Sequence, residues 1–305
     1  MKNFIKKVIK AVQKPKSILL YLTGTEFIAR LFPDKIFLQM RYRIITGRKL
    51  NLDNPQTFNE KLQWLKLYNR KPEYTNMVDK YEVRSYISEK IGEEYLIPLL
   101  GVWDTPDKID FDLLPDKFAI KCNHNSGKGT VICKDKTKLD IEKTKKGLKK
   151  GLKQKYFYHG REWPYKNVKP RIVAEKFIEE ENVRTSDSLV VYKVFCFNSI
   201  PKIIQVIQND KRPNESIDYF DAEWNLLELK QNYPNSETHI EKNVLLEKML
   251  ELSHKLSEGT PFLRVDWYIP NDRLYFSEFT FYSDCGFAKF TPEDWDYKLG
   301  EMIKL

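Results

Sequence analysis

The feature that most constrains this fold is a series of nine short apolar runs that follows residue 95. Each run is rich in β-branched and aromatic residues, and turn residues separate one run from the next. The runs are LIPLLGVWD, KFAIKCN, GTVICK, RIVAEKFI, LVVYKVFCF, PKIIQVIQ, SIDYFDA, FLRVDWYI and RLYFSEFTFY. Helical periodicity interrupts the series near residues 140–155 and 244–257. The pattern predicts mostly antiparallel sheets with a few helices between the strands.

The chain before these runs, residues 20–100, shows helical periodicity instead. The stretch NPQTFNE is a turn followed by a helix start, and LQWLKLY continues it with apolar residues three and four positions apart. A second helix is predicted near residues 78–91, and Gly92 is expected to end it. A helical front before a strand-rich body is typical of an α+β protein.

Charge is distributed unevenly along the 305 residues. The net charge is +9, but residues 1–50 carry 12 Lys and Arg against two acidic residues, so the rest of the chain is nearly neutral. This distribution does not favour a nucleic-acid partner, because the basic charge is terminal and no known nucleic-acid-binding module is present. The four cysteines lack the spacing of a zinc site and fit a reducing cytoplasm, so we expect a cytoplasmic protein.

The first 16 residues, MKNFIKKVIKAVQKPK, predict a short basic amphipathic helix. Two interpretations remain open. The helix either lies on an anionic membrane surface, as a peripheral contact on the inner face of the cell membrane, or docks on its own domain with a solvated lysine face. No apolar run approaches the roughly 20 residues that a membrane span needs, and no signal-peptide cleavage pattern follows the helix.

The segment FLRVDWYIPNDRLYFSEFTFY predicts a β-hairpin around a Pro-Asn-Asp turn. Strand alternation places Glu278 and Thr280 on one face. Asp266 shares that face if a three-residue loop joins the strands, and it then lies opposite Phe276; a two-residue loop would send Asp266 to the other face. Carboxylates that converge among apolar neighbours need a cation, and Mg²⁺ prefers such oxygen ligands. The alternative is a salt bridge, since Arg264 would face Glu278 in the same register.

Three other segments carry weaker signals. In KFAIKCNHNSGKGTVICK, a strand with Lys121 leads into a glycine-bearing loop that is suited to cover a polyphosphate, although an ordinary hairpin loop would look alike. The strand RIVAEKFI ends at Glu175, where backbone groups and acids can meet a nucleoside or simply end the strand. The lysine-rich stretch that runs to GREWPYK suggests capture of a polyanion, with Arg161 and Tyr165 as candidate substrate contacts, or else a solvated helix face.

The order of these parts resembles the ATP-grasp superfamily, and more closely the TupA-like ATP-grasp proteins of bacterial surface-polysaccharide clusters. The matching motifs are FNEKLQWLKLYNR, VDKYEVRSYI, KCNHNSGKG, GREWPYKNVKPRIVAEKFI, RVDWY and FSEFTF, and the likeness spans residues 40–295. It implies an ATP-grasp fold of two α+β subdomains with mostly antiparallel sheets that enclose ATP. The expected units are a basic helix (1–18), a helical region (19–112), a lysine-loop subdomain (113–182) and a metal-binding subdomain (183–305).

The resemblance also implies ATP and Mg²⁺ as cofactors and assigns roles to individual residues. The catalytic set is Lys121, which contacts the α- and β-phosphates, Lys193 and Arg264. Asp266, Glu278 and Thr280 would ligate Mg²⁺, although relatives usually have Asn where Thr280 stands. The nucleotide would be held by the loop Asn125, Ser126, Gly127, Lys128 and Gly129, by Glu175 with the backbone of Lys176, Phe177 and Ile178 at adenine, and by Glu181 at the ribose.

The implied activity is ATP-dependent ligation of a carboxylate to an amine through an acyl phosphate, with substrates that are linked to a glycan. Two other classes stay open. A glycosyltransferase would use Asp266 to hold a nucleotide sugar, but it would leave the lysine loop without a role. A non-catalytic scaffold would attach to a membrane assembly through residues 1–16.

Overall fold

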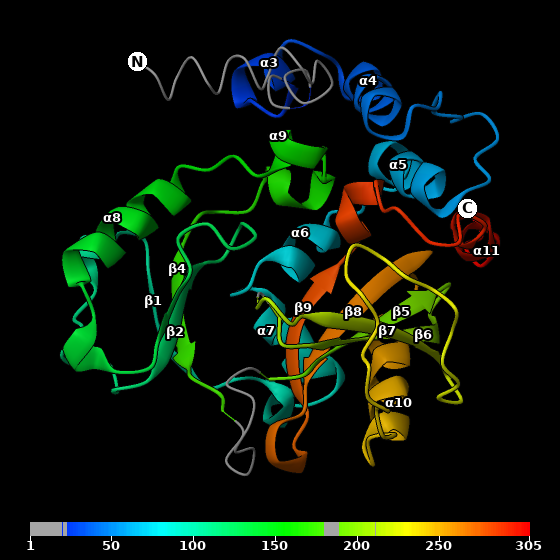
Figure 1. The fold of residues 1–305 in the computed structure, drawn as a ribbon. Helices are drawn as coiled ribbons and strands as arrows, with labels where there is room; N and C mark the ends of the chain where they lie inside the picture. Colours follow the sequence, from blue (N-terminus) through cyan, green and yellow to red (C-terminus); the bar gives the residue numbers. More distant parts are fainter. Residues whose placement is uncertain (1–19, 21–22, 180–188, 211) are drawn as a thin grey trace.

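The structure is a computed structural model that describes residues 20, 23–179, 189–210 and 212–305. The basic helix predicted at residues 1–18 and the predicted ribose contact Glu181 lie outside these residues. None of the helices that can be described combines the length and apolar character needed to cross a membrane. Two sheets, each bordered by helices, form the two lobes of the molecule, and the N-terminal helices lie across their upper ends in Figure 1.

The smaller sheet has the strand order β1-β4-β2-β3, and all its pairings are antiparallel. Its strands are β1 (Leu99–Trp103), β2 (Phe118–Cys122), β3 (Val131–Cys133) and β4 (Ile172–Lys176). Helix α8 (Ile141–Leu152) covers one face, and its Leu148 is fully buried with Ile120 and Ile172 in a core that belongs to this lobe. Alternation explains the other face, where the polar Lys121 lies between buried Ile120 and Cys122.

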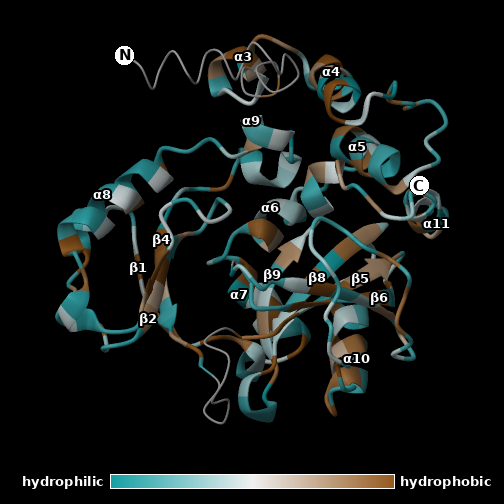
Figure 2. Ribbon diagram, in the orientation of Figure 1, coloured by the Kyte–Doolittle hydropathy of each residue, from teal (hydrophilic) through white to brown (hydrophobic). Residues whose placement is uncertain are grey.

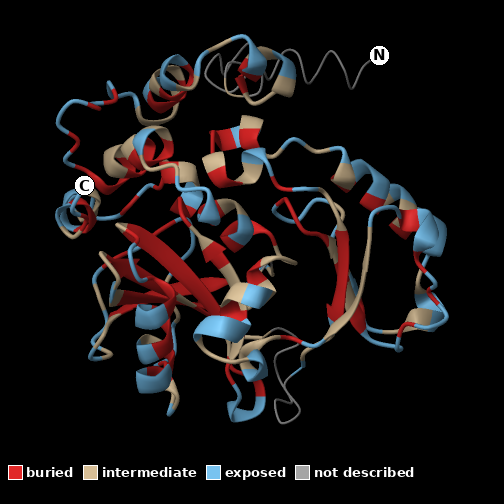
Figure 3. Ribbon diagram, turned by 180° about the vertical axis from the view of Figure 1, so that it is seen from behind, coloured by how far each residue is buried: buried red, intermediate tan, exposed pale blue. Residues whose placement is uncertain are grey.

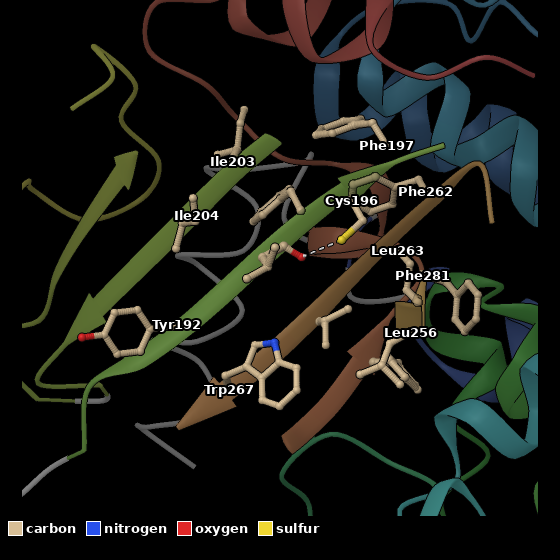
Figure 4. Packing of buried hydrophobic residues seen from close by; sticks show 14 of the residues in the cluster. Tyr192, Cys196, Phe197, Ile203, Ile204, Leu256, Phe262, Leu263, Trp267 and Phe281 are labelled. Atoms are coloured by element: carbon tan, nitrogen blue, oxygen red, sulfur yellow. Dashed lines mark hydrogen bonds between the residues drawn. The ribbon is translucent and has the colours of Figure 1, made fainter. Parts of the chain in front are cut away.

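The larger sheet has the order β7-β6-β5-β8-β9 and is also antiparallel throughout. Its strands are β5 (Val191–Phe197), β6 (Ile200–Gln208), β7 (Ser216–Asp221), β8 (Phe262–Tyr268) and β9 (Tyr275–Thr280). Helix α10 (Leu246–Leu256) packs on one face, where Trp267 is fully buried and donates a hydrogen bond to Ser253 Oγ at 2.9 Å. Figure 4 shows Trp267 and Leu263 projecting from β8 into this core, whereas Phe262 lies on the other face of the strand, where its ring contacts that of Phe58.

The other helices precede the smaller sheet, lie between its strands or follow the larger sheet. They are α3 (Glu26–Arg30), α4 (Asp34–Thr46), α5 (Phe58–Tyr68), α6 (Glu73–Val78), α7 (Val83–Lys90), α9 (Phe157–Gly160) and α11 (Trp295–Glu301). The 3-10 turns are η1 (Glu93–Tyr95), η2 (Pro106–Lys108), η3 (Lys136–Lys138), η4 (Trp163–Lys166), η5 (Pro270–Asp272) and η6 (Ser283–Gly286). Helix α5 begins at a capping box formed by Thr57 and Glu60, as the turn-and-helix motif predicted. Figures 2 and 3 show the apolar, buried strands inside the lobes and the polar, exposed helix faces outside.

The predicted elements are largely confirmed. All nine apolar runs contain a strand, and helices occur near residues 140–155 and 244–257. The second front helix is shorter than predicted because α6 ends at Val78 and Asp79 takes an extended backbone before α7 begins. The boundary expected at residue 112 is also displaced, since β1 lies before it yet pairs with β4 in the smaller sheet.

Candidate active site

The hairpin of β8 and β9 places its two carboxylates directly opposite each other. Asp266 pairs with Glu278, and Arg264 pairs with Thr280. The predicted register, with Asp266 opposite Phe276, is therefore wrong. Trp267 pairs with Phe276, and a β-bulge beyond this pair leaves Ser277 unpaired and places Glu278 opposite Asp266. Without the bulge Asp266 would pair with Ser277, so the bulge is what brings both acids to the same face.

Arg264 forms an ion pair with Asp266 instead of the predicted alternative partner, Glu278. Its Nε and Nη2 donate to the two Asp266 oxygens at 2.7 Å each, so the contact is bidentate. Both side chains are buried, and Arg264 also donates to Thr280 Oγ1 at 3.0 Å. Lys193 on β5 pairs with Asp266 in the sheet, and its Nζ lies 3.9 Å from the carboxylate. Burial and the neighbouring Arg264 lower the pKa of Lys193, and Asp266 offsets this decrease only in part.

Glu278 is held ionised by cations from both sheets and from the turn between α6 and α7. Burial raises its pKa, but Lys80, Arg264, Lys193 and Lys121 together reverse that effect, and the pKa lies below its ordinary value. Lys80 Nζ is 3.6 Å from Glu278 and also donates to the Asn125 carbonyl at 3.0 Å. Lys80 thus links the glycine loop of the smaller sheet to the carboxylate of the larger one.

Lys121 on β2 forms an ion pair with Glu175 on the neighbouring strand. Its Nζ lies 2.6 Å from Glu175 Oε2, and Arg84 lies 3.5 Å from the other carboxylate oxygen. Burial lowers the pKa of Lys121, but Glu175 outweighs this, and the pKa is raised. Tyr268 and Glu278 of the larger sheet act on the pKa of Lys121 in the same direction. Both oxygens of the Glu175 carboxylate therefore lie near cations. The Lys176 N–H, which was predicted to contact adenine, donates to the Pro98 carbonyl at 2.9 Å.

The glycine loop rests on helix α8. Gly127 and Gly129 have φ values of +76° and +83°, a left-handed backbone that L side chains rarely adopt. The Asn125 side chain is buried and donates to the Gly151 carbonyl at 3.3 Å, so it faces the helix, whereas Ser126, Gly127 and Lys128 are exposed. The loop can approach helix α8 closely because Gly151, at the point of contact, has no side chain.

Two helix glycines provide a matched test of this contact. A Cβ at Gly151 would lie 2.7 Å from Cys122 Sγ and 2.8 Å from the Lys128 carbonyl, but a Cβ at Gly147 would meet nothing within 4 Å. We expect Gly151→Ala to lower the free energy of unfolding by about 1–3 kcal/mol, since the loop or the helix must move. Gly147→Ala should raise it by up to about 1 kcal/mol through helix propensity. Urea unfolding measures both, and equal effects of the two substitutions would contradict the packing described.

A cavity of about 380 Å³ lies among these side chains. Of the predicted site residues, it is lined by Ser126, Tyr165, Lys193, Arg264, Asp266, Glu278 and Thr280. They come from the glycine loop, from η4 and from strands β5, β8 and β9, so residues far apart in the sequence meet at one cavity.

The sequence model of the TupA-like ATP-grasp family matches residues 60–304. The chain belongs to that family. Two antiparallel sheets with a cavity that both lobes border are the α+β arrangement expected of the ATP-grasp fold. No curated protein matches this TupA-like ATP-grasp chain.

Solved structures resemble this chain at low identity. D-alanine–D-alanine ligase from Bacillus anthracis complexed with ATP is 15% identical, with 67% of this chain and 53% of that chain covered and a TM-score of 0.39. D-alanine–D-alanine ligase from Helicobacter pylori is 13% identical, with 81% and 69% covered and a TM-score of 0.41. The ATP-grasp ligase PsnB, complexed with a phosphomimetic variant of its minimal precursor, Mg and ADP, is 10% identical, with 80% and 63% covered and a TM-score of 0.41. The chain thus spans between about half and two thirds of the length of these relatives.

The paired carboxylates fit a magnesium ion that is shared with a nucleotide. Asp266, Glu278 and Thr280 offer only hard oxygen donors, and they lie within one hairpin. Across the described part of the chain, no three His, Cys, Asp or Glu residues are grouped as a metal site. Mg²⁺ commonly takes one or two protein carboxylates and completes its shell with phosphate oxygens and water, so two acids suffice.

Arg161 does not contact the cavity, which corrects its prediction as a substrate contact. Its guanidinium is buried, donates to the carbonyls of Ala29 and Phe32, and lies 3.2 Å from Asp34. The charge is thus used to attach the N-terminal helices to the body of this TupA-like protein. Tyr165, predicted beside it, does line the cavity.

Sequence reasoning gave no role to Lys80, Arg84 or Glu162. Lys80 and Arg84 both lie in the family motif VDKYEVRSYI, four residues apart, and such spacing on a helical segment was the available signal. Glu162 directly follows Arg161 and lines the cavity. Nothing in the local sequence distinguishes Glu162 from a surface acid.

Lys66 is completely buried beneath the cavity. Its Nζ donates to the carbonyls of Gly160 and Cys285 at 2.7 Å each, which joins the segment before η4 to η6. Burial lowers its pKa from 10.5 to about 8, with Cys285 and Glu162 partly opposing this. The charged ammonium is therefore disfavoured in the folded protein relative to the unfolded chain.

This burial predicts a dependence of stability on pH. Between about pH 8 and pH 10.5 the unfolded chain binds more protons at Lys66 than the folded protein does, so this contribution to stability rises with pH. The free energy of unfolding of the wild type, relative to Lys66→Met, should rise by up to about 3 kcal/mol over this range. Urea unfolding at several pH values measures it. Lys71→Met is the control, because Lys71 donates to the Gly259 carbonyl from an exposed position; the same slope in both comparisons would contradict the interpretation.

Proposed function

We propose that this protein is an ATP-dependent, ADP-forming ligase that joins a carboxylate to an amine through an acyl phosphate. Membership of the TupA-like ATP-grasp family supports the proposal. The observation that carries it is the convergence of Lys193, Asp266 and Glu278 at a cavity, with Lys121 of the other sheet among the cations that lower the pKa of Glu278. Phosphoryl transfer requires little covalent chemistry from the protein and depends on such positioned charges.

In this proposal the residues have separate tasks. Lys121 and Lys193 neutralise phosphate oxygens, and the exposed part of the glycine loop, Ser126 to Gly129, covers the nucleotide. Asp266, Glu278 and Thr280 hold Mg²⁺, which supplies positive charge to the transferring phosphoryl group when it is bound. Arg264 orients Asp266 through its bidentate contact. Lys80 couples the position of the loop to Glu278 through its two contacts.

We also propose a biological role, a cellular location and a division of the chain into units. The family resemblance supports a role in bacterial surface polysaccharide biosynthesis, with a glycan-linked acid or amine as substrate. We place the protein in the cytoplasm, with residues 1–16 as a peripheral membrane contact. The units 1–18, 19–112, 113–182 and 183–305 remain our division of the chain, except that β1 joins the sheet of the third unit.

Thermal unfolding of the full chain tests the proposal. ATP with Mg²⁺ should raise the midpoint by a few degrees, since a ligand at 100 times its dissociation constant adds about 2.7 kcal/mol. UDP-sugars at the same concentration should leave it unchanged. A shift with UDP-sugars alone would reject the ligase and favour a glycosyltransferase. An ATP shift justifies a screen of acids and amines for ADP release.

A further inference from the structure

One wall of the cavity is formed by turns and a short helix instead of by strands. It contains Tyr156, Tyr165, Tyr282, Cys285 and Glu162. The rings of Tyr156 and Tyr165 lie 4.7 Å apart in an edge-to-face arrangement. Glu162 is only 5% exposed, although it borders the cavity. This wall therefore combines aromatic surface with one deeply buried carboxylate.

Glu162 differs from Asp266 and Glu278 in its partners, and it differs from Asp284, which also lines the cavity, in being buried. Asp266 is bound by Arg264, and Glu278 lies near Lys80. The Glu162 carboxylate instead accepts a hydrogen bond from Cys285 Sγ at 3.0 Å, and within the described residues no Lys or Arg forms an ion pair with it. Burial raises its pKa, and the nearby Lys66 and the Cys285 hydrogen bond offset this only in part. A buried carboxylate without a cation is costly, and a cationic ligand would remove that cost.

The backbone around this carboxylate is fixed. Lys66 binds the Gly160 carbonyl, two residues before Glu162, and the Cys285 carbonyl, next to the thiol that contacts Glu162. Asp284 and Cys285 have φ values of +48° and +54°, so η6 turns sharply and presents the Cys285 side chain to Glu162. Lys66 donates two hydrogen bonds to these carbonyls, and among the described residues it forms none with the Glu162 carboxylate.

We infer that the wall of Tyr156, Glu162, Tyr165 and Tyr282 binds the amine substrate as a primary alkylammonium ion. The inference rests on the proposed function, since it names the substrate class of the same cavity. Glu162 supplies the opposite charge, and the tyrosine rings supply faces that attract a cation while excluding water. The amine is thus held by different residues of the cavity from the phosphates, which the cationic Lys193 and Arg264 attract.

Ethylammonium chloride is the probe, used up to about 0.2 M against sodium chloride at equal ionic strength, with ethanol as the neutral analogue. We expect ethylammonium alone to raise the thermal midpoint of the wild type. Glu162→Gln, which keeps the size and a hydrogen-bond acceptor for Cys285, should weaken the apparent affinity on the order of 10-fold. Tyr165→Leu should weaken it less. Glu215→Gln is the control, because Glu215 is also buried but does not line the cavity.

The same samples are then measured with ATP and Mg²⁺. Glu162→Gln should retain the wild-type ATP shift, so loss of the ammonium effect cannot be attributed to unfolding or to loss of the nucleotide site. An ATP shift without any ethylammonium effect would overturn the inference and leave the proposed function standing. An ethylammonium effect that persists in Glu162→Gln, or a Glu162-dependent shift with Mg²⁺ alone, would also overturn it. Absence of the ATP shift would reject the proposed function separately.

Discussion

Replacing Lys121 with Met should lower kcat/KM for ATP by about 10²–10³-fold, measured as ADP release with an active pair of substrates. Met keeps most of the side-chain volume and removes the charge that neutralises phosphate in the proposed mechanism. The ATP-dependent rise in thermal midpoint should fall in parallel, and this measurement needs no knowledge of the acid or the amine. Glu175 retains Arg84 at 3.5 Å, which limits the loss of stability.

Lys117→Met is the matched control for this substitution. Lys117 also pairs with a glutamate, with its Nζ 2.7 Å from Glu179, but both side chains are half exposed. An exposed pair contributes between about 0 and 1 kcal/mol, so neither the ATP shift nor stability should change much. Equal loss of the ATP shift in both variants would show that general charge, and not the position of Lys121, binds the nucleotide.

Asp266→Asn and Glu278→Gln should both remove the magnesium-dependent part of the ATP shift, and ADP release should fall by about 10³-fold or more in each. Their effects on the nucleotide-free protein should differ. Asp266→Asn leaves the buried Arg264 without its bidentate partner and should lower the free energy of unfolding by about 3–5 kcal/mol. Glu278 is 39% exposed and 3.6 Å from Lys80, so Glu278→Gln should cost about 1 kcal/mol or less.

Urea unfolding without nucleotide, followed by magnesium titration with ATP, separates these two effects. If Asp266→Asn is as stable as the wild type, the Arg264 contact contributes no net stability and the structural argument fails. If Glu278→Gln keeps the full magnesium response, Glu278 is not a ligand. Either result would be informative without an identified substrate.

Local pattern predicted most of the secondary structure. Runs of β-branched and aromatic residues between turns located the strands, and the turn NPQTFNE located the start of α5. The cross-strand register of the hairpin of β8 and β9 was predicted incorrectly, because the residue types around Ser277 do not indicate a β-bulge. A one-residue bulge changes every cross-strand neighbour beyond it, so such an error alters the expected contacts of Asp266 and Arg264.

Arg161 shows a second kind of error. Its position after an aromatic segment resembled a recognition site for a carboxylate, yet helices more than a hundred positions earlier in the chain supply Asp34 and two backbone carbonyls to it. Glu162, beside it, points to the cavity. Arg161 thus holds the N-terminal helices, whereas the adjacent Glu162 lines the cavity, and only the partners of the two residues distinguish them.

Most elements, the family and a set of candidate residues for phosphate and magnesium could be predicted before the fold was known, because they follow from periodicity and from motifs that are contiguous in the chain. Which charges meet depends instead on how the chain packs in three dimensions. Lys121 with Glu175 and Lys80 with Glu278 are paired by strand register and by packing between segments that are far apart in the chain. Coulombic energy depends on distance and on burial, and neither quantity can be read from positions along a chain.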